Sequence, residues 1–250
     1  MKEADLLAVQ AAAKALRLAS VSANASELAE VASREHWGHL RYLSEVLQSE
    51  MDLRESRRAE RLLAEARLPR AKLFSGFDIS ASALSPETIS YLARGEFLET
   101  ATSVVLIGGP GTGKSHLLIA TLAALAAQGR RVRYVNAAAL VNELAEAEDE
   151  KRLLRLIERY GKFSALAIDE LGYLHLDRRG AELLFQVITE REESSSVLVG
   201  TNLPFSEWGS VFPDARLAAA VVDRITFRAK ILETGTDSYR LRATVNAQRN

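Results

Sequence analysis

The second half of the chain alternates short apolar runs with longer amphipathic stretches. The apolar runs are rich in aliphatic and β-branched residues, and they occupy Ser103–Ile107, 131–135, 163–168 and 196–199. Such runs are typical of strands buried on both faces of a parallel sheet. Between them, apolar residues recur at helical spacing over 115–128, 137–147, 150–160 and 181–191. This rhythm predicts an α/β fold, a parallel sheet with helices on both faces.

The region before residue 69 has a different pattern, without proline or strand-like runs and dominated by Ala, Leu, Glu and Arg. Apolar residues follow helical spacing at Leu6, Val9, Ala13 and Leu16, and again at Leu40, Leu43, Val46, Leu47 and Met51. The stretch 19–25 predicts a break between helices, with Ser26 as the next N-cap. A third helix is expected over 37–66, and Pro69 is expected to end it. We therefore predict a small all-helical domain over 1–68, for partner or DNA interaction, and an α/β domain over 69–250.

A glycine-rich loop separates the strand Ser103–Ile107 from the helix expected over 115–128. It reads G-x-x-x-x-G-K-S, the spacing of a phosphate-binding P-loop, in the strand–loop–helix context that this motif requires. The glycines let backbone N–H groups turn toward a triphosphate, and the helix N-terminus adds its dipole. Lys114 is expected to reach the β- and γ-phosphates, and the Ser115 hydroxyl to bind Mg²⁺. The predicted ATP site consists of Gly108, Gly109, Pro110, Gly111, Thr112, Gly113, Lys114, Ser115 and His116.

Polar residues follow two further predicted strands. Asp169 and Glu170 come after the run 163–168, and Asn202 follows the run 196–199. Because ligands of parallel sheets bind at the carboxyl ends of the strands, these residues are expected to meet the P-loop. Asp169 is expected to hold Mg²⁺, Glu170 to polarise the attacking water, and Asn202 to orient that water. The alternatives are an acidic pair that opens a helix and a turn asparagine before Leu203-Pro204.

Sites that transfer phosphoryl groups often take an arginine from a neighbouring subunit. Arg224 lies in the segment VVDRITFR, after the last of these strand ends, and is our candidate for such an arginine. Arg216 and Arg228 are rival candidates. The alternative for Arg224 is a surface residue paired with Asp223.

Composition narrows the class of protein. The 250 residues are 48% hydrophobic and 26% charged, as in ordinary globular proteins, and the net charge is −1. The chain has no cysteine, which excludes disulfides and suits a reducing compartment, so we expect a cytoplasmic protein. We find no signal peptide and no apolar stretch long enough to span a bilayer, and we expect no membrane partner.

With a nearly neutral chain, a DNA-binding surface has to come from local clusters of basic residues. In the helix expected over 150–160, basic residues lie on one face, and a lysine follows: Arg152, Arg155, Arg159 and Lys162. The opposite face is expected to pack inward through Leu153, Leu154, Leu156 and Ile157. We predict that the basic face binds DNA phosphates; the alternative is a solvated face paired with Glu150 and Glu158. The pair Arg178-Arg179 and the stretch 54–72 are further basic clusters.

Six motifs together are similar to a known family. GGPGTGKSHL, LAIDELGYL, GAELLFQVI, TNLPFSEW, VVDRI and DSYRLR resemble the IstB family of transposition helper ATPases, which are AAA+ proteins related to the DnaC and DnaI helicase loaders. The resemblance covers nearly the whole chain. TNLPFSEW and DSYRLR are shared with the loaders, whereas the helical N-terminal region ending in ARLPRAK resembles IstB more closely.

The resemblance implies a sheet of order 5-1-4-3-2, with 229–234 as the remaining strand. It implies ATP-driven self-assembly on double-stranded DNA and activation of a cognate transposase. It also implies that Lys114 and Ser115 belong to Walker A, Asp169 and Glu170 to Walker B, Asn202 to sensor 1, and that Arg224 is the finger supplied in trans. Helices inserted after the second strand line the DNA channel in related loaders and initiators, which again indicates the helix over 150–160, together with the preceding helix over 137–147.

Two features depart from the family pattern. Arg178-Arg179 is more basic than the turn expected there, and the C-terminal region leaves little room for a helical lid, so no sensor-2 arginine is assigned. The alternative function is a replicative helicase loader of the DnaC or DnaI type. A small-molecule kinase is disfavoured, because Glu170 and a candidate finger suit hydrolysis in a homo-oligomer.

Overall fold

The computed structural model describes residues 3–239 of the chain. It divides into two compact units, one up to Arg61 and one from Leu62 onward. The division falls within a single helix, α3 (His39–Glu65), whose last turn belongs to the second unit. Among the described residues, no helix is both long enough and apolar enough to cross a membrane.

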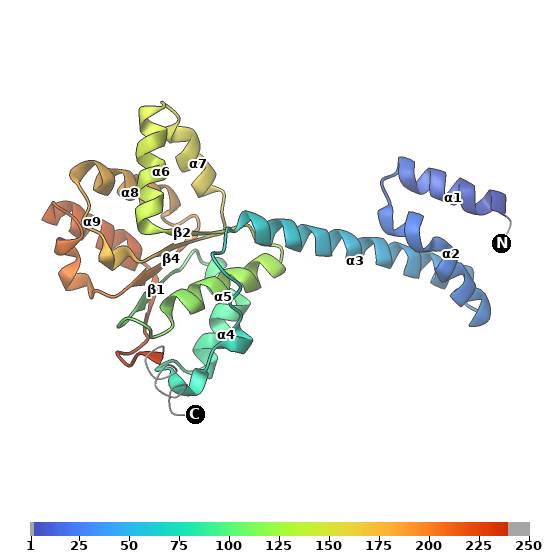
Figure 1. The fold of residues 1–250 in the computed structure, drawn as a ribbon, viewed down its shortest axis with the longest axis horizontal. Helices are drawn as coiled ribbons and strands as arrows, with labels where there is room; N and C mark the ends of the chain where they lie inside the picture. The colour runs from blue at the N-terminus through green and yellow to red at the C-terminus, as the bar shows by residue number, and fades with distance from the viewer. Residues whose placement is uncertain (1–2, 240–250) are drawn as a thin grey trace, which may run out of the picture. The chain divides into compact units, whose positions relative to one another are not determined.

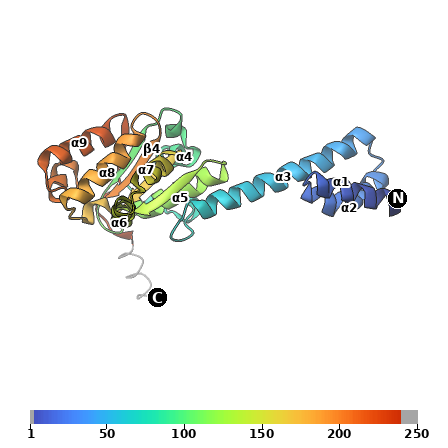
Figure 2. The ribbon, with the colours of Figure 1, turned by 90° about the horizontal axis from the view of Figure 1, so that it is seen from above.

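The first unit consists of α1 (Glu3–Ala15), α2 (Ala19–Arg34) and most of α3. Helices α1 and α2 lie side by side (Figure 2). The small core between these helices contains Ala13, Val21, Ala25 and Val46. The other apolar residues of the predicted α3 stripe, Leu40, Leu43, Leu47 and Met51, are 47–83% exposed.

The predicted break at 19–25 is wrong, because this stretch forms the first turns of α2 and Ser26 lies inside the helix. The chain turns earlier, where Arg17 adopts a left-handed conformation with φ 58°. Ser20 then enters the core, where its backbone N–H donates to Glu50 at 2.8 Å and its hydroxyl to Ser49 at 3.0 Å. These tertiary contacts outweigh the weak helix propensity of the serines.

The second unit is built on a parallel sheet whose strand order is β2-β3-β4-β1-β5. The strands are β1 (Ser103–Ile107), β2 (Val132–Asn136), β3 (Ala165–Asp169), β4 (Ser196–Thr201) and β5 (Ala229–Glu233). The expected α/β class and the expected order 5-1-4-3-2 are therefore confirmed. The helices are α4 (Pro86–Arg94), α5 (Lys114–Ala127), α6 (Ala137–Asp149), α7 (Leu153–Gly161), α8 (Arg178–Arg191) and α9 (Ala215–Thr226). Short 3₁₀ turns occupy Phe74–Gly76, Ile79–Ala81, Glu96–Leu98, Leu171–Tyr173 and Phe205–Ser210.

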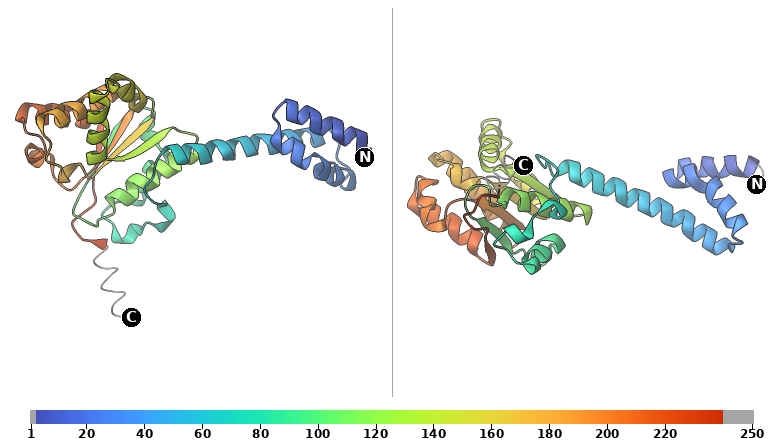
Figure 3. Two further views of the ribbon diagram at one scale, coloured as in Figure 1. Left: turned by 45° about the horizontal axis from the view of Figure 1, so that its top comes forward. Right: turned by 60° about the horizontal axis from the view of Figure 1, so that its bottom comes forward.

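Helices cover both faces of the sheet (Figures 1 and 3). Side chains of successive strand residues point to opposite faces, so Val105 packs in the core that includes α6 to α9, and Val104 in the core that includes α4 and α5. The strand register brings Asn136 opposite Asp169, and Ile107 opposite Thr201. The carboxyl ends of these strands therefore lie along the same side of the sheet, which is called the carboxyl edge below.

Helices α7 and α8 begin at other residues than predicted, each for an identifiable reason. Helix α7 starts at Leu153 rather than 150, because Lys151 is left-handed and Arg152 is the residue before the helix. Leu154 is 75% exposed rather than packed inward. Helix α8 starts at Arg178, because the Asp177 side chain accepts the N–H of Gly180 at 2.7 Å and caps the helix. Arg178 and Arg179 therefore lie in the first turn of a helix and not in a loop.

Candidate active site

The P-loop joins β1 to α5 through two glycines in left-handed conformations. Gly111 has φ 79° and Gly113 has φ 98°, and a Cβ on Gly113 would lie 2.7 Å from the ring of Phe77. Only glycine fits such a position without strain. The Nζ of Lys114 donates to the carbonyls of Gly108 at 2.7 Å and Gly109 at 2.8 Å. The ammonium group is thus held across the loop, within reach of a phosphate bound there.

The chain that follows β5 supports the P-loop. The hydroxyls of Thr112 and Thr234 are 2.7 Å apart, and the Gly109 N–H donates to the Gly235 carbonyl at 2.9 Å. The N–H of Tyr239 donates to the Gly111 carbonyl at 3.1 Å. Sequence reasoning missed these contacts because the two segments are far apart in the chain. The rest of the DSYRLR motif, residues 240–242, lies outside the described residues, as does most of the region considered for a lid.

Asp169 ends β3 and is only 2% exposed. Its Oδ2 accepts the hydroxyl of Tyr134 at 2.7 Å, and its Oδ1 accepts the N–H of Glu170 at 2.9 Å. Burial and the adjacent carboxylate raise the pKa of Tyr134, so its hydroxyl stays a donor at neutral pH. Gly200 lies so close that an added Cβ would meet Asp169 Oδ1 at 2.3 Å. The carboxylate is therefore fixed from several sides.

Glu170 is exposed at the same edge of the sheet, in a left-handed conformation with φ 63°. Asn136, at the end of β2, donates a hydrogen bond from its Nδ2 to the carboxylate of Glu170. The Oδ1 of Asn136 also accepts the N–H of Ala138 at 2.9 Å and so caps α6. The pairing of Asn136 with Glu170 depends on the register of β2 and β3, which no local sequence pattern contains.

Asn202 directly follows β4. Its Oδ1 is buried and has no hydrogen-bond donor among the described residues. The turn after Glu170 packs tightly against it, since a Cβ on Gly172 would meet this oxygen at 2.4 Å. A buried acceptor without a donor at a polar edge is a group that a water or ligand would satisfy.

The oxygen atoms at this edge fit Mg²⁺ bound together with ATP. Mg²⁺ keeps several waters and commonly takes one or two protein oxygens together with substrate phosphates. Ser115, at the start of α5, and Asp169 supply one hydroxyl and one carboxylate. No group of three His or carboxylate side chains that could hold a metal occurs within residues 3–239. His116 instead contacts the segment before the sheet: its Nε2 lies 2.8 Å from the Leu73 carbonyl, and its ring packs edge-on against Phe77.

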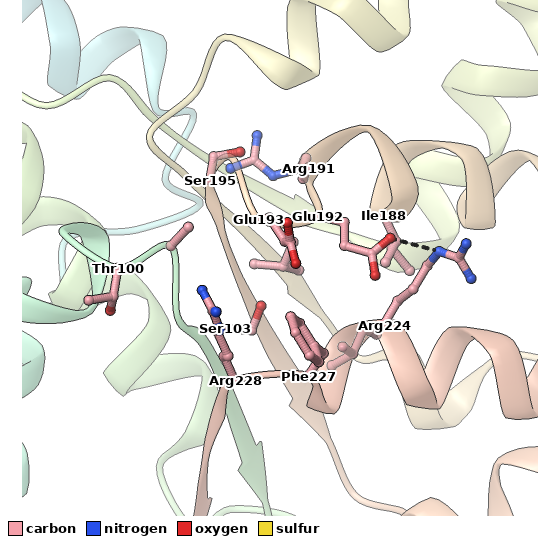
Figure 4. Close-up of a pocket in the computed structure, with 13 residues that line it drawn as sticks. Thr100, Ser103, Ile188, Arg191, Glu192, Glu193, Ser195, Arg224, Phe227 and Arg228 are labelled. Carbon is pink, nitrogen blue, oxygen red and sulfur yellow. Dashed lines mark ion pairs between the residues drawn. The ribbon is translucent and has the colours of Figure 1, made fainter.

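Arg224 lies on α9, beside a pocket at the amino ends of the strands, opposite the end that carries the P-loop (Figure 4). Its Nε is 3.1 Å from Oε2 of Glu192, and its guanidinium lies over the ring of Phe185 at 4.5 Å. The pocket is also lined by Ser103, at the amino end of β1, and by Arg228. The length of strand β1, about 15 Å, separates this pocket from the P-loop. Arg224 therefore does not meet the P-loop of its own chain, and its partner is Glu192 rather than Asp223.

The basic face of α7 is only partly paired with acidic residues. Arg152 forms an ion pair with Glu150, and Arg159 pairs with Glu143 of α6 rather than with Glu158. Within the described part of the chain, Arg155 and Lys162 are exposed and form no ion pair. The nearby basic residues of α8 are also paired, Arg178 with Glu182 and Arg179 with Glu148 and Asp149.

The strand order, the P-loop after β1, the acidic pair at the end of β3 and the polar residue after β4 define the fold of a P-loop NTPase of the AAA+ type. Solved structures of two proteins share the fold. AMPPCP-bound DnaA from Aquifex aeolicus aligns with 73% of this chain and 56% of its own, at a TM-score of 0.58 and 18% identity. DnaI aligns with 70% of this chain and 92% of its own, at a TM-score of 0.53 and 19% identity.

Residues 11–247 match the family described as IstB-like ATP binding protein, and the chain belongs to this family. An insertion sequence ATP-binding protein of Sinorhizobium fredii is 37% identical over 94% of this chain and 80% of its own. The ATP-binding protein of insertion sequence IS21 from Pseudomonas aeruginosa is 32% identical over 91% of this chain and 86% of its own. The resemblance inferred from the motifs is thereby confirmed.

Proposed function

We propose that this protein is the helper ATPase of an insertion sequence. It binds ATP with Mg²⁺, hydrolyses ATP as a homo-oligomer on double-stranded DNA, and activates the cognate transposase. The observation that carries this proposal is the convergence of Lys114, Asp169, Glu170 and Asn202 at one sheet edge in an IstB-like chain. The names of the relatives place such proteins in insertion sequences, which supports a transposase as partner.

The residues of the site divide the reaction between them. Backbone N–H groups of the loop and the N-terminus of α5 bind the phosphates, and Lys114 exchanges its two carbonyl acceptors for phosphate oxygens. Ser115 and Asp169 would hold Mg²⁺, which supplies positive charge beside the phosphates when bound. Glu170 leaves Asn136 and accepts a proton from the attacking water, and the unpaired oxygen of Asn202 orients that water.

The position of Arg224 supports self-assembly. Arg224 lies at the amino end of the sheet, away from the P-loop of its own chain, where it lines a pocket and pairs with Glu192. In an oligomer this end faces the nucleotide of a neighbouring subunit, where an arginine stabilises the transition state. Arg224 has to exchange Glu192 for the phosphates to do so.

The test measures phosphate release from ATP by the full chain, alone, with duplex DNA, and with duplex DNA and the transposase of the same element. We expect hydrolysis that duplex DNA stimulates and that the transposase increases further. The Glu170→Gln variant is the control for contaminating ATPases. Absence of hydrolysis in every combination would refute the proposal, and stimulation by a replicative helicase instead of DNA would favour the helicase loader.

A further inference from the structure

Tyr134 lies on β2, the edge strand of the sheet, two residues before Asn136. Its hydroxyl donates to Oδ2 of Asp169 at 2.7 Å, across the neighbouring strand β3. Sequence patterns give tyrosine no role here, because a tyrosine in an amphipathic strand is usually a packing residue. The contact with the proposed magnesium ligand therefore requires a separate explanation.

The backbone around Tyr134 is fixed. Its N–H donates to the carbonyl of Ala66, in the turn that follows α3, at 2.9 Å. Its ring is half-buried against the core that includes Leu62 and Leu125. Val132 and Asn136, on either side, pair with β3. The hydroxyl is thus held in place by the strand and the core, and does not depend on Asp169 for its position.

Asp169 in turn depends on Tyr134. One oxygen, Oδ1, is fixed by the Glu170 N–H and by the close approach of Gly200. Among the described residues, the other oxygen, Oδ2, has the Tyr134 hydroxyl as its donor. Without that donor, the carboxylate would be restrained only through Oδ1, and a buried oxygen would lose its hydrogen bond.

We propose that Tyr134 is a positioning residue that orients the Asp169 carboxylate for the Mg²⁺ of bound ATP. The proposal rests on the assignment of Asp169 as a magnesium ligand in the function proposed above. Partners that orient a metal ligand commonly change metal affinity by about 10- to 100-fold when they are removed. Tyr134 acts through Asp169, so its removal changes the response to Mg²⁺ and not the intrinsic contacts of the nucleotide.

The experiment titrates Mg²⁺ into the full chain with the fluorescent nucleotide mant-ATP and compares wild type with Tyr134→Phe. Phenylalanine keeps the ring in the core and removes only the hydroxyl. We expect the Mg²⁺ concentration at half-maximal binding to rise by about tenfold or more. Binding of mant-ATP in EDTA should stay unchanged.

Tyr160→Phe is the matched control, because the buried hydroxyl of Tyr160 also donates to a carboxylate, that of Glu143 at 2.6 Å, away from the P-loop. It should leave the Mg²⁺ midpoint unchanged. In an Asp169→Asn background, Tyr134→Phe should cause no further shift, because the carboxylate on which Tyr134 acts is gone.

A Tyr134→Phe midpoint equal to wild type would overturn the proposal, as would an equal shift in Tyr160→Phe or an undiminished shift in the Asp169→Asn background. Failure of the proposed function gives a different result. A wild-type chain that binds mant-ATP with Mg²⁺ but never hydrolyses ATP would refute the ATPase, and the midpoints would still measure the role of Tyr134.

Discussion

The salt dependence of DNA binding should separate the unpaired cations of α7 from the ion-paired ones. Arg155 and Lys162 are exposed on one face, whereas Arg152 and Arg159 are paired with carboxylates. A paired arginine must leave its carboxylate before it binds a phosphate, so its net gain from DNA is smaller. We therefore expect most of the phosphate binding by this face to come from Arg155 and Lys162.

The magnitude follows from counterion release. Each phosphate contact contributes about 0.9 to the slope of log affinity against log salt. Replacing Arg155 and Lys162 by glutamine removes two contacts, so the slope should fall by about 1.8. Between about 50 and 200 mM salt, the loss of affinity should then be about 12-fold smaller than in wild type.

The assay is fluorescence anisotropy on two duplexes of unrelated sequence, with a non-hydrolysable ATP analogue present. The control is the double variant Arg152→Gln/Arg159→Gln, which carries the same change of charge and should retain nearly the wild-type slope. Both duplexes should respond alike, since phosphate contacts do not read bases. A control variant that flattens the slope as much as Arg155→Gln/Lys162→Gln would refute the reasoning from ion pairs. Wild-type slopes in both variants would place the DNA surface elsewhere.

Four further substitutions test the site and the fold. Lys114→Ala should abolish equilibrium binding of an ATP analogue, because the phosphates lose their cation; unchanged affinity would reject the P-loop assignment. Glu170→Gln should bind ATP normally but release phosphate at least about 100-fold more slowly; a wild-type rate would reject its role as base. Arg224→Ala should bind nucleotide, lose about 10³-fold or more in turnover, and regain some activity when mixed with Glu170→Gln; no rescue at any ratio would count against a trans finger. Arg191→Met should lower the free energy of unfolding, measured in urea, by about 3 kcal/mol. The buried guanidinium of Arg191 donates to the carbonyls of Tyr160, Phe163 and Ser196, which would lose their donor. An unchanged midpoint of urea unfolding would contradict this prediction.

Local patterns predicted β1 to β4 well because these strands are largely buried on both faces, whereas the more exposed β5 was expected only from the family resemblance. A run such as Ser103–Ile107 has no exposed side, so its apolar composition alone identifies it. The ends of helices were harder. The beginnings of α7 and α8 depend on single residues, the left-handed Lys151 and the capping Asp177. The break in the N-terminal region moved because Ser20 makes contacts with α3 that no local pattern contains.

The candidate site was predictable where a residue follows a strand directly. Glu170 and Asn202 occupy such positions and Asp169 is the last residue of β3, so parallel pairing brings all three to the carboxyl ends of the strands. Lys114 lies beyond the loop that follows β1, and the P-loop spacing identified it instead. Tyr134 was not predictable, because its contact with Asp169 depends on strand register and on the depth of its ring in the core.

The side chain of Asn136 makes two hydrogen bonds, one that caps the helix next to it in the chain and one to a residue that directly follows a neighbouring strand. A residue between a strand and a helix needs a side-chain acceptor for the first N–H groups of the helix, and the Oδ1 of Asn136 meets that need at Ala138. An aspartate would cap the helix as well but has no donor when it is ionised, and a serine would have to accept and donate through a single oxygen, whereas an amide does so through two separate atoms. The Nδ2 of Asn136 supplies that donor to Glu170. The start of α6 and the orientation of the proposed catalytic base are therefore set by one amide group, so any change that moves the first turn of α6 also changes the hydrogen bond that restrains Glu170.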